Sequence, residues 1–277
     1  MNLTNYHSHC SFCDGKAPME DFVRSAIAAG FTAYGVSSHA PLPFSTKWTL
    51  EKDCLSAYLS ELEFLKSKYV DQIELYTGLE IDYLTEEHNP SSPFFQKLPL
   101  DYRIGSVHMV YTDEGKLLDT DLDSEDFKVK LNECHGDLKQ IVKLYFEASM
   151  RMVELGGFDF IAHPDKIALN ASYCETGIDE KSWYKKMRED LFALIAEKEL
   201  IMEINTKAFS AKSRFFPAQK HFALIKEMGI RVVVNSDAHY PEFVNSGRAE
   251  ALQALKAIGV QTVCELHGGK WQELAIY

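Results

Sequence analysis

The sequence predicts an α/β protein with a parallel sheet closed into a barrel. Short apolar runs alternate with longer amphipathic ones along the 277 residues, which favours parallel strands joined by helices. Histidines and acidic residues recur at or near the ends of the apolar runs. Closure into a barrel would bring all strand ends of one polarity to a single face, where these side chains could share a site.

Seven apolar runs are short enough to be strands, and several contain β-branched residues, as at Val36 and Val232–Val234. They end near His7, Ser38, Gly78, Val107, Ala162, Ile204 and Val234. Amphipathic segments between or after these runs are predicted helices, and glycines such as Gly30 and Gly229 follow several of them. The predicted helices cover about 18–29, 49–69, 138–156, 179–198, 217–228 and 246–258.

Two stretches interrupt the alternation. Residues 84–101 contain Asn89-Pro90-Ser91-Ser92-Pro93 and are expected to form a loop excursion. Residues 112–137 are rich in Asp and Glu and are expected to form a long polar insertion with a short helix. Long loops at the active-site end of a barrel often shape the substrate pocket. Because no repeat or domain boundary is evident, residues 1–277 are predicted to form a single domain.

The composition narrows the functional classes. A formal net charge of −12 does not favour a general nucleic-acid binder. Bound divalent cations would offset part of this charge locally, so a phosphate substrate is compatible with it. No apolar stretch approaches the roughly 20 residues needed to cross a bilayer, and the start of the chain lacks a signal-peptide pattern. We therefore expect a cytoplasmic protein that acts on a small molecule, without a membrane partner.

The six cysteines include one Cys-x-x-Cys, formed by Cys10 and Cys13, which is a pattern of redox pairs and of half zinc sites. No second such pair exists, and no βα pattern precedes this one. The cysteines are therefore expected to be reduced bystander thiols.

Nine side chains of the types that bind borderline divalent metals lie at or near the predicted strand ends. In His7-Ser8-His9 the two imidazoles are two residues apart, so in a strand they point to the same side. Nine ligands exceed the needs of one ion, which indicates a multinuclear metallohydrolase. The candidate ligands are His7, His9, Asp14, His39, Glu80, His108, His163, Asp237 and His239.

Each of these residues taken alone has a simpler explanation. A lone histidine at a strand end, such as His39 or His108, is more often a structural hydrogen-bonding group than a ligand. Asp14 or Glu80 alone would be a cap or a solvated residue. The whole set changes this balance, because six of the ten histidines follow strand-like runs. The four others are His88, His135, His221 and His267.

The motifs around these residues resemble those of the PHP (polymerase and histidinol phosphatase) family, over most of the chain. They are His-x-His with Asp14 after it, Ser-His39, Gly-x-Glu80, Gly-Ser-x-His108, His163-Pro-Asp and Ser-Asp237-Ala-His239. The resemblance implies a distorted (β/α)7 TIM-like barrel, the PHP fold, with a trinuclear metal site. Within the family, the chain is most similar to the monofunctional histidinol-phosphate phosphatases, in the segments 78–83, 105–109, 157–165 and 203–206 and in the insertion before the predicted helix at 138–156.

The resemblance implies hydrolysis of L-histidinol phosphate to L-histidinol and phosphate, in histidine biosynthesis. Three divalent ions are implied, for which these ligands admit Zn, Mn or Fe. A hydroxide bridging two ions would attack the phosphate, with Glu80, Asp237 and His239 as catalytic residues. The implied ligand sets are His7, His9, Glu80 and Asp237 for the first ion, Glu80, His108 and His163 for the second, and Asp14, His39 and His239 for the third.

A phosphate substrate also needs cationic donors from the protein. Lys207 and Arg214 are the leading candidates, although each could equally be a solvated surface charge. Asp165 is a candidate partner for the cationic groups of histidinol. The predicted substrate-binding residues are Lys207, Arg214, Asp165 and Lys166, and Lys212, Arg248, Phe209, Phe216 and Tyr240 are further candidates.

Two other interpretations stay open. One is a PHP-family phosphoesterase that acts on another small phosphate or a nucleotide, because the segment Lys207–Pro217 departs from the small residues and basic group common in histidinol-phosphate phosphatases. The other is a non-catalytic scaffold braced by metals. Nine ligand positions argue against the scaffold, since closed structural sites usually need four ligands for each ion. Metal content together with turnover distinguishes the three.

Overall fold

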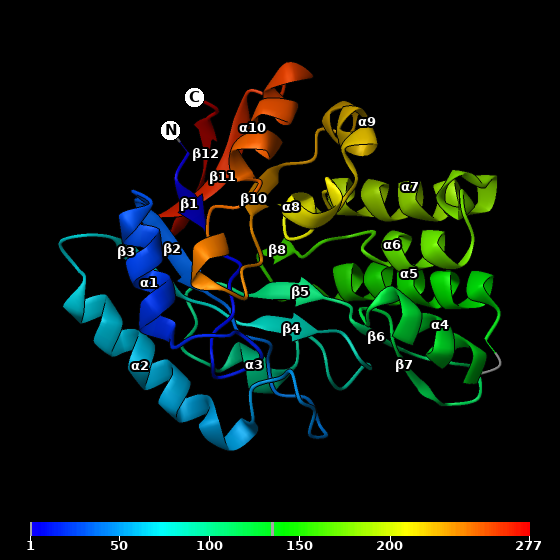
Figure 1. The fold of residues 1–277 in the computed structure, drawn as a ribbon, viewed down its shortest axis with the longest axis horizontal. Coiled ribbons are helices and arrows are strands. Elements are labelled where there is room, and N and C mark those ends of the chain that lie inside the picture. The colour runs from blue at the N-terminus through cyan, green and yellow to red at the C-terminus, as the bar shows by residue number, and fades with distance from the viewer. Residues whose placement is uncertain (1, 134–135) are drawn as a thin grey trace.

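The structure, a computed structural model, describes residues 2–133 and 136–277 and has parallel strands at its centre with helices outside them (Figure 1). The parallel strands form two sheets, with the orders β1-β2-β3 and β10-β9-β8-β5-β4. These strands are β1 Thr4–Asn5, β2 Ala33–Val36, β3 Glu74–Thr77, β4 Glu80–Asp82, β5 Ile104–Ser106, β8 Phe160–Ile161, β9 Ile201–Asn205 and β10 Val232–Asn235.

Two bridges join these sheets into a closed barrel. Ser8 pairs with Ala238 just beyond β1 and β10, and His39 pairs with Glu80 of β4, both in parallel register. The backbone N–H of residue His9 also donates to the carbonyl of Ala238 at 2.9 Å. With β3 and β4 counted as one bent strand, seven strands surround the barrel axis, so the predicted distorted (β/α)7 barrel is confirmed.

The bend between β3 and β4 lies at Gly78 and Leu79. A Cβ atom on Gly78 would lie 2.2 Å from the ring of Tyr102, so only glycine fits at this point. The sequence predicted that the strand ends near Gly78. That prediction was incomplete, because the chain resumes as β4 and places Glu80 inside the sheet.

The six predicted helices are present on the outside of the barrel, with small differences at their ends. Helix α5 illustrates why these segments form helices. Asp137 accepts a hydrogen bond from the backbone of Lys139 at the start of the helix, apolar residues line one face, and Gly156 ends the helix at φ 67°. These helices are α1 Met19–Ala28, α2 Leu55–Lys68, α5 Leu138–Leu155, α7 Ser182–Glu197, α9 Phe222–Glu227 and α10 Arg248–Ala257, with the 3-10 turns η1 Lys52–Cys54 and η3 Gln219–His221 before α2 and α9.

The alternation of side chains along each strand separates the inside of the barrel from the outside. On β9, Met202 and Ile204 pack in the cluster under the outer helices, whereas Ile201 packs inside with Tyr6 and Phe160. The next inward positions of β9 are polar, ending at Asn205. The inside of the barrel therefore changes from apolar to polar along the strands, towards their carboxyl ends.

The chain forms several elements that the sequence did not predict. An antiparallel hairpin closes the apolar end of the barrel, and its Trp271 ring lies 5.2 Å from that of Tyr6 and 5.7 Å from that of Phe160. The hairpin was missed because the predicted alternation places a helix between successive strands, and none lies between the two strands of the hairpin. The unpredicted elements are β11 Thr262–His267, β12 Lys270–Ala275, α6 Ile167–Cys174, α8 Phe209–Lys212, η2 Ile178–Glu180 and η4 Pro241–Phe243.

Both predicted insertions contain regular structure. Residues 84–101 hold the one-turn helix α3 Pro93–Gln96. The polar insertion contains the predicted helix, α4 Ser124–Glu133, and also strand β7 Leu117–Asp119, which pairs with β6 Met109–Tyr111. Cys134 and His135 lie outside the described residues. The assignment of residues 1–277 to a single domain stays a prediction.

The two chain ends lie side by side, since the backbone N–H of Tyr277 donates to Asn2 Oδ1 at 3.2 Å.

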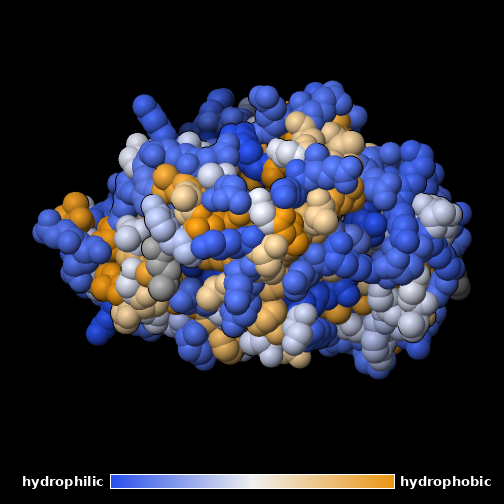
Figure 2. Space-filling view, turned by 90° about the horizontal axis from the view of Figure 1, so that it is seen from above, coloured by the Kyte–Doolittle hydropathy of each residue, from blue (hydrophilic) through white to orange (hydrophobic). Residues whose placement is uncertain are grey.

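Hydrophilic residues cover most of the face shown in Figure 2, and apolar ones gather in a band across its middle. Among the helices of the described residues, we find none with the length and apolarity needed to span a bilayer.

Candidate metal centre

All nine candidate ligands come together at the carboxyl ends of the barrel strands, and Glu80 lies at their centre. Its carboxylate oxygens are 3.1 Å from His7 Nε2, 3.0 Å from His39 Nδ1 and 2.9 Å from His163 Nε2. His108 Nε2 lies 3.5 Å from the same carboxylate. Glu80 is fully buried, so it can contact ligands from opposite sides of the barrel.

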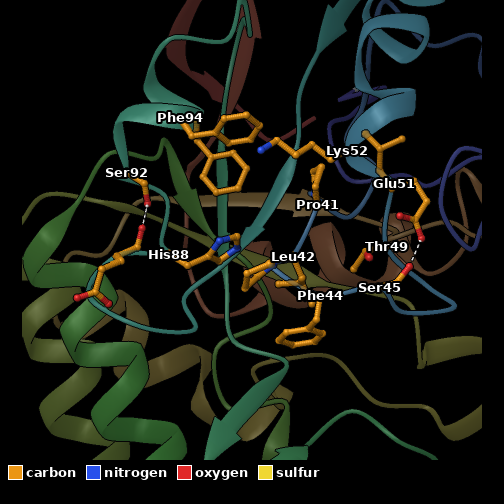
Figure 3. Close-up of a pocket in the computed structure, with 14 residues that line it drawn as sticks. Pro41, Leu42, Phe44, Ser45, Thr49, Glu51, Lys52, His88, Ser92 and Phe94 are labelled. Atoms are coloured by element: carbon orange, nitrogen blue, oxygen red, sulfur yellow. Dashed lines mark hydrogen bonds between the residues drawn. The ribbon is translucent and has the colours of Figure 1, made fainter.

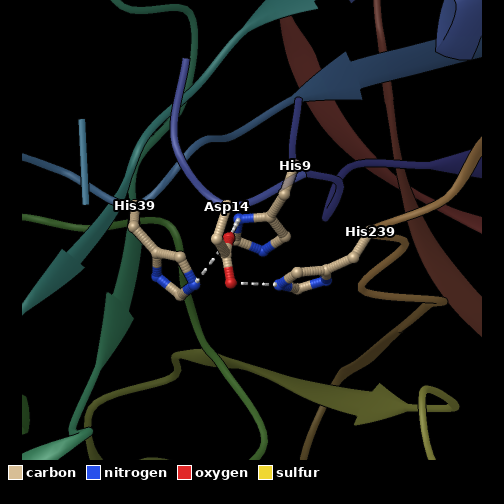
Figure 4. Close-up of side chains that lie close together, drawn as sticks. All are labelled: His9, Asp14, His39 and His239. Carbon is tan, nitrogen blue, oxygen red and sulfur yellow. Dashed lines mark ion pairs between the residues drawn. The ribbon is translucent and has the colours of Figure 1, made fainter. Parts of the chain in front are cut away.

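A second group of contacts surrounds Asp14, whose side chain is less buried than that of Glu80. The oxygens of Asp14 lie 3.3 Å from His239 Nε2, 3.8 Å from His39 Nε2 and 4.0 Å from His9 Nδ1. Figure 4 shows the Asp14 carboxylate between the rings of His39 and His239. Asp237 links the two groups of contacts, with Oδ1 3.1 Å from His9 Nε2 and 3.4 Å from His239 Nδ1. The nine residues therefore make one continuous cluster.

The cluster contains many buried polar atoms without a hydrogen-bond partner among the described residues. Such atoms are costly to bury, and a concentration of them in one place requires an explanation. Divalent cations satisfy imidazole nitrogens and carboxylate oxygens at once, so these residues fit metal ions. The unpartnered atoms are His7 Nε2, His9 Nε2, Asp14 Oδ1, His39 Nδ1, Glu80 Oε2, His108 Nε2, His163 Nδ1 and Asp237 Oδ1.

Several side chains already have the protonation state that metal binding needs. Burial, together with the nearby His239 and His39, holds the pKa of His9 well below its usual range, which favours the neutral imidazole. Burial alone would raise the pKa of Glu80, but the surrounding histidines outweigh it and hold that pKa well below the usual range. Neutral imidazoles and ionised carboxylates are the forms that coordinate metals.

His7 and His108 behave differently. Burial lowers the pKa of His108, but the carboxylates of Asp82 and Glu80 on its two sides outweigh this and raise it to about 9. The pKa of His7 is raised in the same way by Glu203 and Glu80. Each ring thus has a carboxylate on its far side, and a metal ion on the near side would take the place of a proton.

These outer carboxylates orient the candidate ligands, and the sequence interpretation did not assign them. His7 Nδ1 lies 2.7 Å from Glu203 Oε1, and the backbone N–H of His163 donates to Glu203 Oε2 at 2.9 Å. His108 Nδ1 lies 2.9 Å from Asp82 Oδ1. Carboxylate–histidine pairs of this kind fix the ring that binds a metal. The two-residue spacing from Glu80 was the signal that could have identified Asp82.

The backbone is strained at two residues of the cluster, His163 and Asp237, and at Asp165 beside it. His163, Asp165 and Asp237 have positive φ values of 27°, 77° and 47°, which side chains with a Cβ rarely adopt. Strain of this kind concentrates at functional sites, where the surrounding structure holds it in place.

Cys13 also contacts the cluster, with Sγ 3.6 Å from His9 Nδ1, and the described cysteines are free thiols.

Two of the four predicted substrate-binding residues lie beside the cluster. Lys207 Nζ is 3.4 Å from Asp237 Oδ1 and 3.3 Å from His239 Nε2. Lys166 Nζ is 2.5 Å from Asp121 Oδ2. Both ammonium groups are therefore held close to the candidate ligands by acidic neighbours.

The two others lie in a separate group, in which Asp165 is buried and Arg214 is half-buried. Asp165 accepts a hydrogen bond from the hydroxyl of Tyr184 at 2.5 Å, and the Arg214 guanidinium lies over the Phe216 ring at 5.5 Å. Neither residue lines the pocket described next. Arg248, a further candidate, is buried and donates to the Val234 and Asn2 carbonyls, which is a structural role.

A pocket of about 200 Å³ opens onto the cluster. It includes four residues that were not among the candidates, one of which is Trp48, whose ring lies edge-on to His39 and His108 at 4.8 and 5.5 Å. The lining residues are Asp14, His39, Trp48, His108, Asp119, Asp121, Leu122, Lys207 and His239.

A larger cavity of about 490 Å³ lies among Leu42, Phe44, Phe94 and other residues (Figure 3). Its lining includes one histidine, His88, and none of the nine candidate ligands. The smaller pocket is therefore the one suited to metal chemistry.

Six imidazoles and three carboxylates gathered at the carboxyl ends of barrel strands define a metal-dependent barrel enzyme. The model of one protein family, described as the PHP domain, matches residues 5–207, and the chain belongs to this family.

Named relatives agree with this assignment. The chain is 26% identical to a Schizosaccharomyces pombe protein named a probable histidinol-phosphatase, over 95% of this chain and 89% of that one. It is 31% identical to a Bacillus subtilis histidinol-phosphatase over 53% of this chain and 59% of that one. A solved structure of Lactococcus lactis histidinol phosphate phosphatase, complexed with zinc, L-histidinol and phosphate, has a TM-score of 0.75 at 20% identity and covers 98% of this chain and 99% of that one.

Proposed function

We propose that this protein hydrolyses L-histidinol phosphate to L-histidinol and phosphate with the help of three divalent ions. The observation that carries the proposal is the convergence of nine metal-binding side chains, with their unpartnered buried atoms, beside a pocket that also contains a lysine. Relatives named as histidinol-phosphatases support the choice of substrate. The zinc, L-histidinol and phosphate bound to the Lactococcus lactis protein support both the proposed substrate and the proposed need for divalent ions.

Three groups of the cluster would hold the ions. They are His7, His9, Glu80 and Asp237, then Glu80, His108 and His163 with Glu80 shared, and finally Asp14, His39 and His239. The proximity of His7, His9 and Glu80 supports the first group, and that of His9, Asp14, His39 and His239 supports the third. In the second group, His163 Nε2 and His108 Nε2 lie 2.9 and 3.5 Å from Glu80 Oε1. Imidazole and carboxylate ligands suit Zn, Mn or Fe. When bound, such ions neutralise the phosphate and lower the pKa of a coordinated water towards neutrality.

The side chains of the protein have distinct tasks in this proposal. Glu80, Asp237 and His239 are the proposed catalytic residues, because they lie where the ligand groups meet. Lys207, in the pocket wall, supplies a cationic donor to the phosphate, and Lys166 adds positive charge behind Asp121. Glu203 and Asp82 hold the rings of His7 and His108 so that their other nitrogens face the centre.

The arrangement does not assign a substrate role to Asp165 or Arg214. Asp165 instead anchors the His163-Pro164-Asp165 turn to Tyr184 of helix α7. We keep both as second-choice substrate-binding residues, to be tested by substitution.

Phosphate release tests the proposal directly. The protein is stripped of metal, reloaded with Zn, Mn or Fe, and given L-histidinol phosphate beside nucleotides and sugar phosphates. We expect metal-dependent release with a clear preference for L-histidinol phosphate. Activity on another substrate alone would exclude the histidine-pathway assignment while keeping a phosphoesterase, and inactivity with every metal would favour the scaffold.

A further inference from the structure

The polar insertion supplies one wall of the pocket over the candidate metal centre. Asp119, Asp121 and Leu122 line the pocket on this side, facing Lys207 and the candidate ligands. Asp119 ends strand β7, where it pairs with Met109, the residue that follows His108. An acidic wall so close to a phosphate-binding centre needs a reason, because it repels a simple phosphate dianion.

The wall is held firmly in place. The backbone N–H and hydroxyl of Thr120 donate to the carbonyl of His108 at 2.7 and 2.9 Å. The side-chain amide of Asn170 donates to the carbonyls of Thr120 and Leu122 at 3.0 and 2.8 Å. Asp119 Oδ1 accepts from the backbone N–H of Asp121 at 2.8 Å. The carboxylates therefore have fixed positions in the pocket, as a recognition site requires.

The two carboxylates differ in their partners. Asp121 is paired with Lys166 at 2.5 Å. Asp119 has no ion pair within 4.0 Å among residues 2–133 and 136–277, although it is half-buried. Burial raises the pKa of Asp119, and this outweighs the hydrogen bond from the backbone of Asp121 and the nearby His108, which lower it. The Asp119 carboxylate therefore presents to the pocket a negative charge that is not neutralised by an ion pair within the described residues.

Trp48 adds a second feature that suits a cation. Its ring lies in the same pocket, and aromatic faces attract ammonium and imidazolium groups. The pocket therefore combines a phosphate-binding side, formed by the candidate metal ligands and Lys207, with the acidic wall that carries Asp119, and the Trp48 ring lines the same pocket.

We propose that Asp119 binds the cationic amine of the substrate and makes the pocket selective for phosphate esters of amino alcohols. This inference rests on the proposed phosphatase function and specifies how it chooses its substrate. A substrate whose phosphate and amine are separated by a short carbon chain reaches both sides of the pocket. An ester without the amine leaves the half-buried Asp119 carboxylate covered by the ligand and unpaired, which costs binding energy.

Two matched substrate pairs test the proposal. The first is L-histidinol phosphate and its deaminated analogue, 3-(imidazol-4-yl)propyl phosphate. The second is phosphoethanolamine and ethyl phosphate. We expect the wild-type protein to favour the amine-bearing member of a pair by about 10- to 100-fold in kcat/KM, as a hydrogen bond to a charged group implies.

The substitution Asp119→Asn removes the charge but keeps an oxygen that can accept from the backbone of Asp121, so the hairpin is preserved. We expect this variant to reduce the preference to about threefold or less, mainly through KM for the amine-bearing substrate. Asp113→Asn, on the exposed tip of the same hairpin, is the matched control and should keep the wild-type preference.

The outcomes separate this proposal from the proposed function. Turnover of L-histidinol phosphate with the same preference in wild type and Asp119→Asn would overturn the role of Asp119 but keep the function. Equal losses on both members of a pair would also overturn it, since they would indicate a general catalytic role. An Asp119-dependent preference for phosphoethanolamine, without turnover of L-histidinol phosphate, would support Asp119 as the amine site and reject the histidinol assignment.

Discussion

The two ends of the barrel interior are both buried, yet they differ in how their polar atoms are satisfied. At the apolar end, the hydroxyl of Tyr6 donates to the carbonyl of Leu266 at 3.0 Å and accepts from its N–H at 2.8 Å. The hydroxyl of Tyr102 donates to the carbonyl of Tyr6 at 2.6 Å. At the other end, buried atoms of eight candidate ligands, His9 among them, have no hydrogen-bond partner in the described part of the chain.

This contrast distinguishes structure from function within one core. The β11–β12 hairpin completes the apolar end with atoms of the chain itself, so that end stabilises the fold. In the proposed function, bound cations satisfy the polar end, so its unpartnered buried atoms cost stability in the metal-free protein. Changes at the two ends should therefore affect different measurements.

The largest effect should follow from removing a ligand at the polar end. We expect His9→Ala or Asp237→Asn to lower kcat on the phosphate substrate by about a thousandfold or more, which corresponds to at least about 4 kcal/mol of transition-state stabilisation. Circular dichroism should show that the fold persists. The control His88→Ala changes a histidine of the larger cavity, outside the cluster, and should stay within about threefold of wild type. Near-wild-type turnover in either ligand variant would sink the assignment.

A smaller effect should follow from changing a residue behind the ligands. Glu203→Gln keeps the shape of the side chain but removes the charge beside His7, so we expect metal affinity to fall by about 10- to 100-fold. Titration of the metal-free protein, followed by calorimetry, measures this change. An unaltered affinity would mean that Glu203 is a packing residue only.

The pocket lysine should act on substrate binding. We expect Lys207→Ala to raise KM by about tenfold or more, as loss of a charge-assisted hydrogen bond to phosphate implies. Arg214→Ala should raise KM less, because Arg214 does not line the pocket. Steady-state kinetics of the two variants makes the comparison, and the reverse order would move the phosphate clamp to the separate group around Asp165.

The smallest effect on activity should come from the apolar end. Tyr102→Phe keeps the ring that packs against Gly78 but loses the hydrogen bond to Tyr6, and we expect a loss of about 1–2 kcal/mol in the free energy of unfolding. Activity should stay within about twofold. Thermal unfolding with and without metal provides the check: the increase in Tm on adding metal should equal that of wild type, and a reduced increase would show that the two ends are coupled.

Much of the fold could be predicted because it follows from local patterns. The period of apolar residues located the helices, and the strand-end histidines pointed to a shared face. The β11–β12 hairpin was missed although Gly268-Gly269 between its strands is a two-residue turn signal. Its position at the end of the barrel depends on contacts between distant residues, such as that of Trp271 with Tyr6.

The sequence also located the candidate ligands of the site, but not the residues that surround them. The structure brings the nine candidate ligands together, and their role as metal ligands stays a prediction. Glu203 and Trp48 were missed because each contacts a residue far away in sequence, His7 in one case and His108 in the other. Arg214 and Asp165 were chosen for charge and position along the chain, which say nothing about the direction of a side chain.

The most direct test of the central claim, that the polar end of the barrel is a metal centre, is anomalous diffraction from crystals grown with zinc. We predict anomalous peaks enclosed by the nine ligands, next to the unpartnered atoms of Glu80, His9 and Asp14, and their weakening in the Asp237→Asn variant. A zinc-loaded crystal without a peak among these side chains, or with peaks only elsewhere on the molecule, would contradict the account.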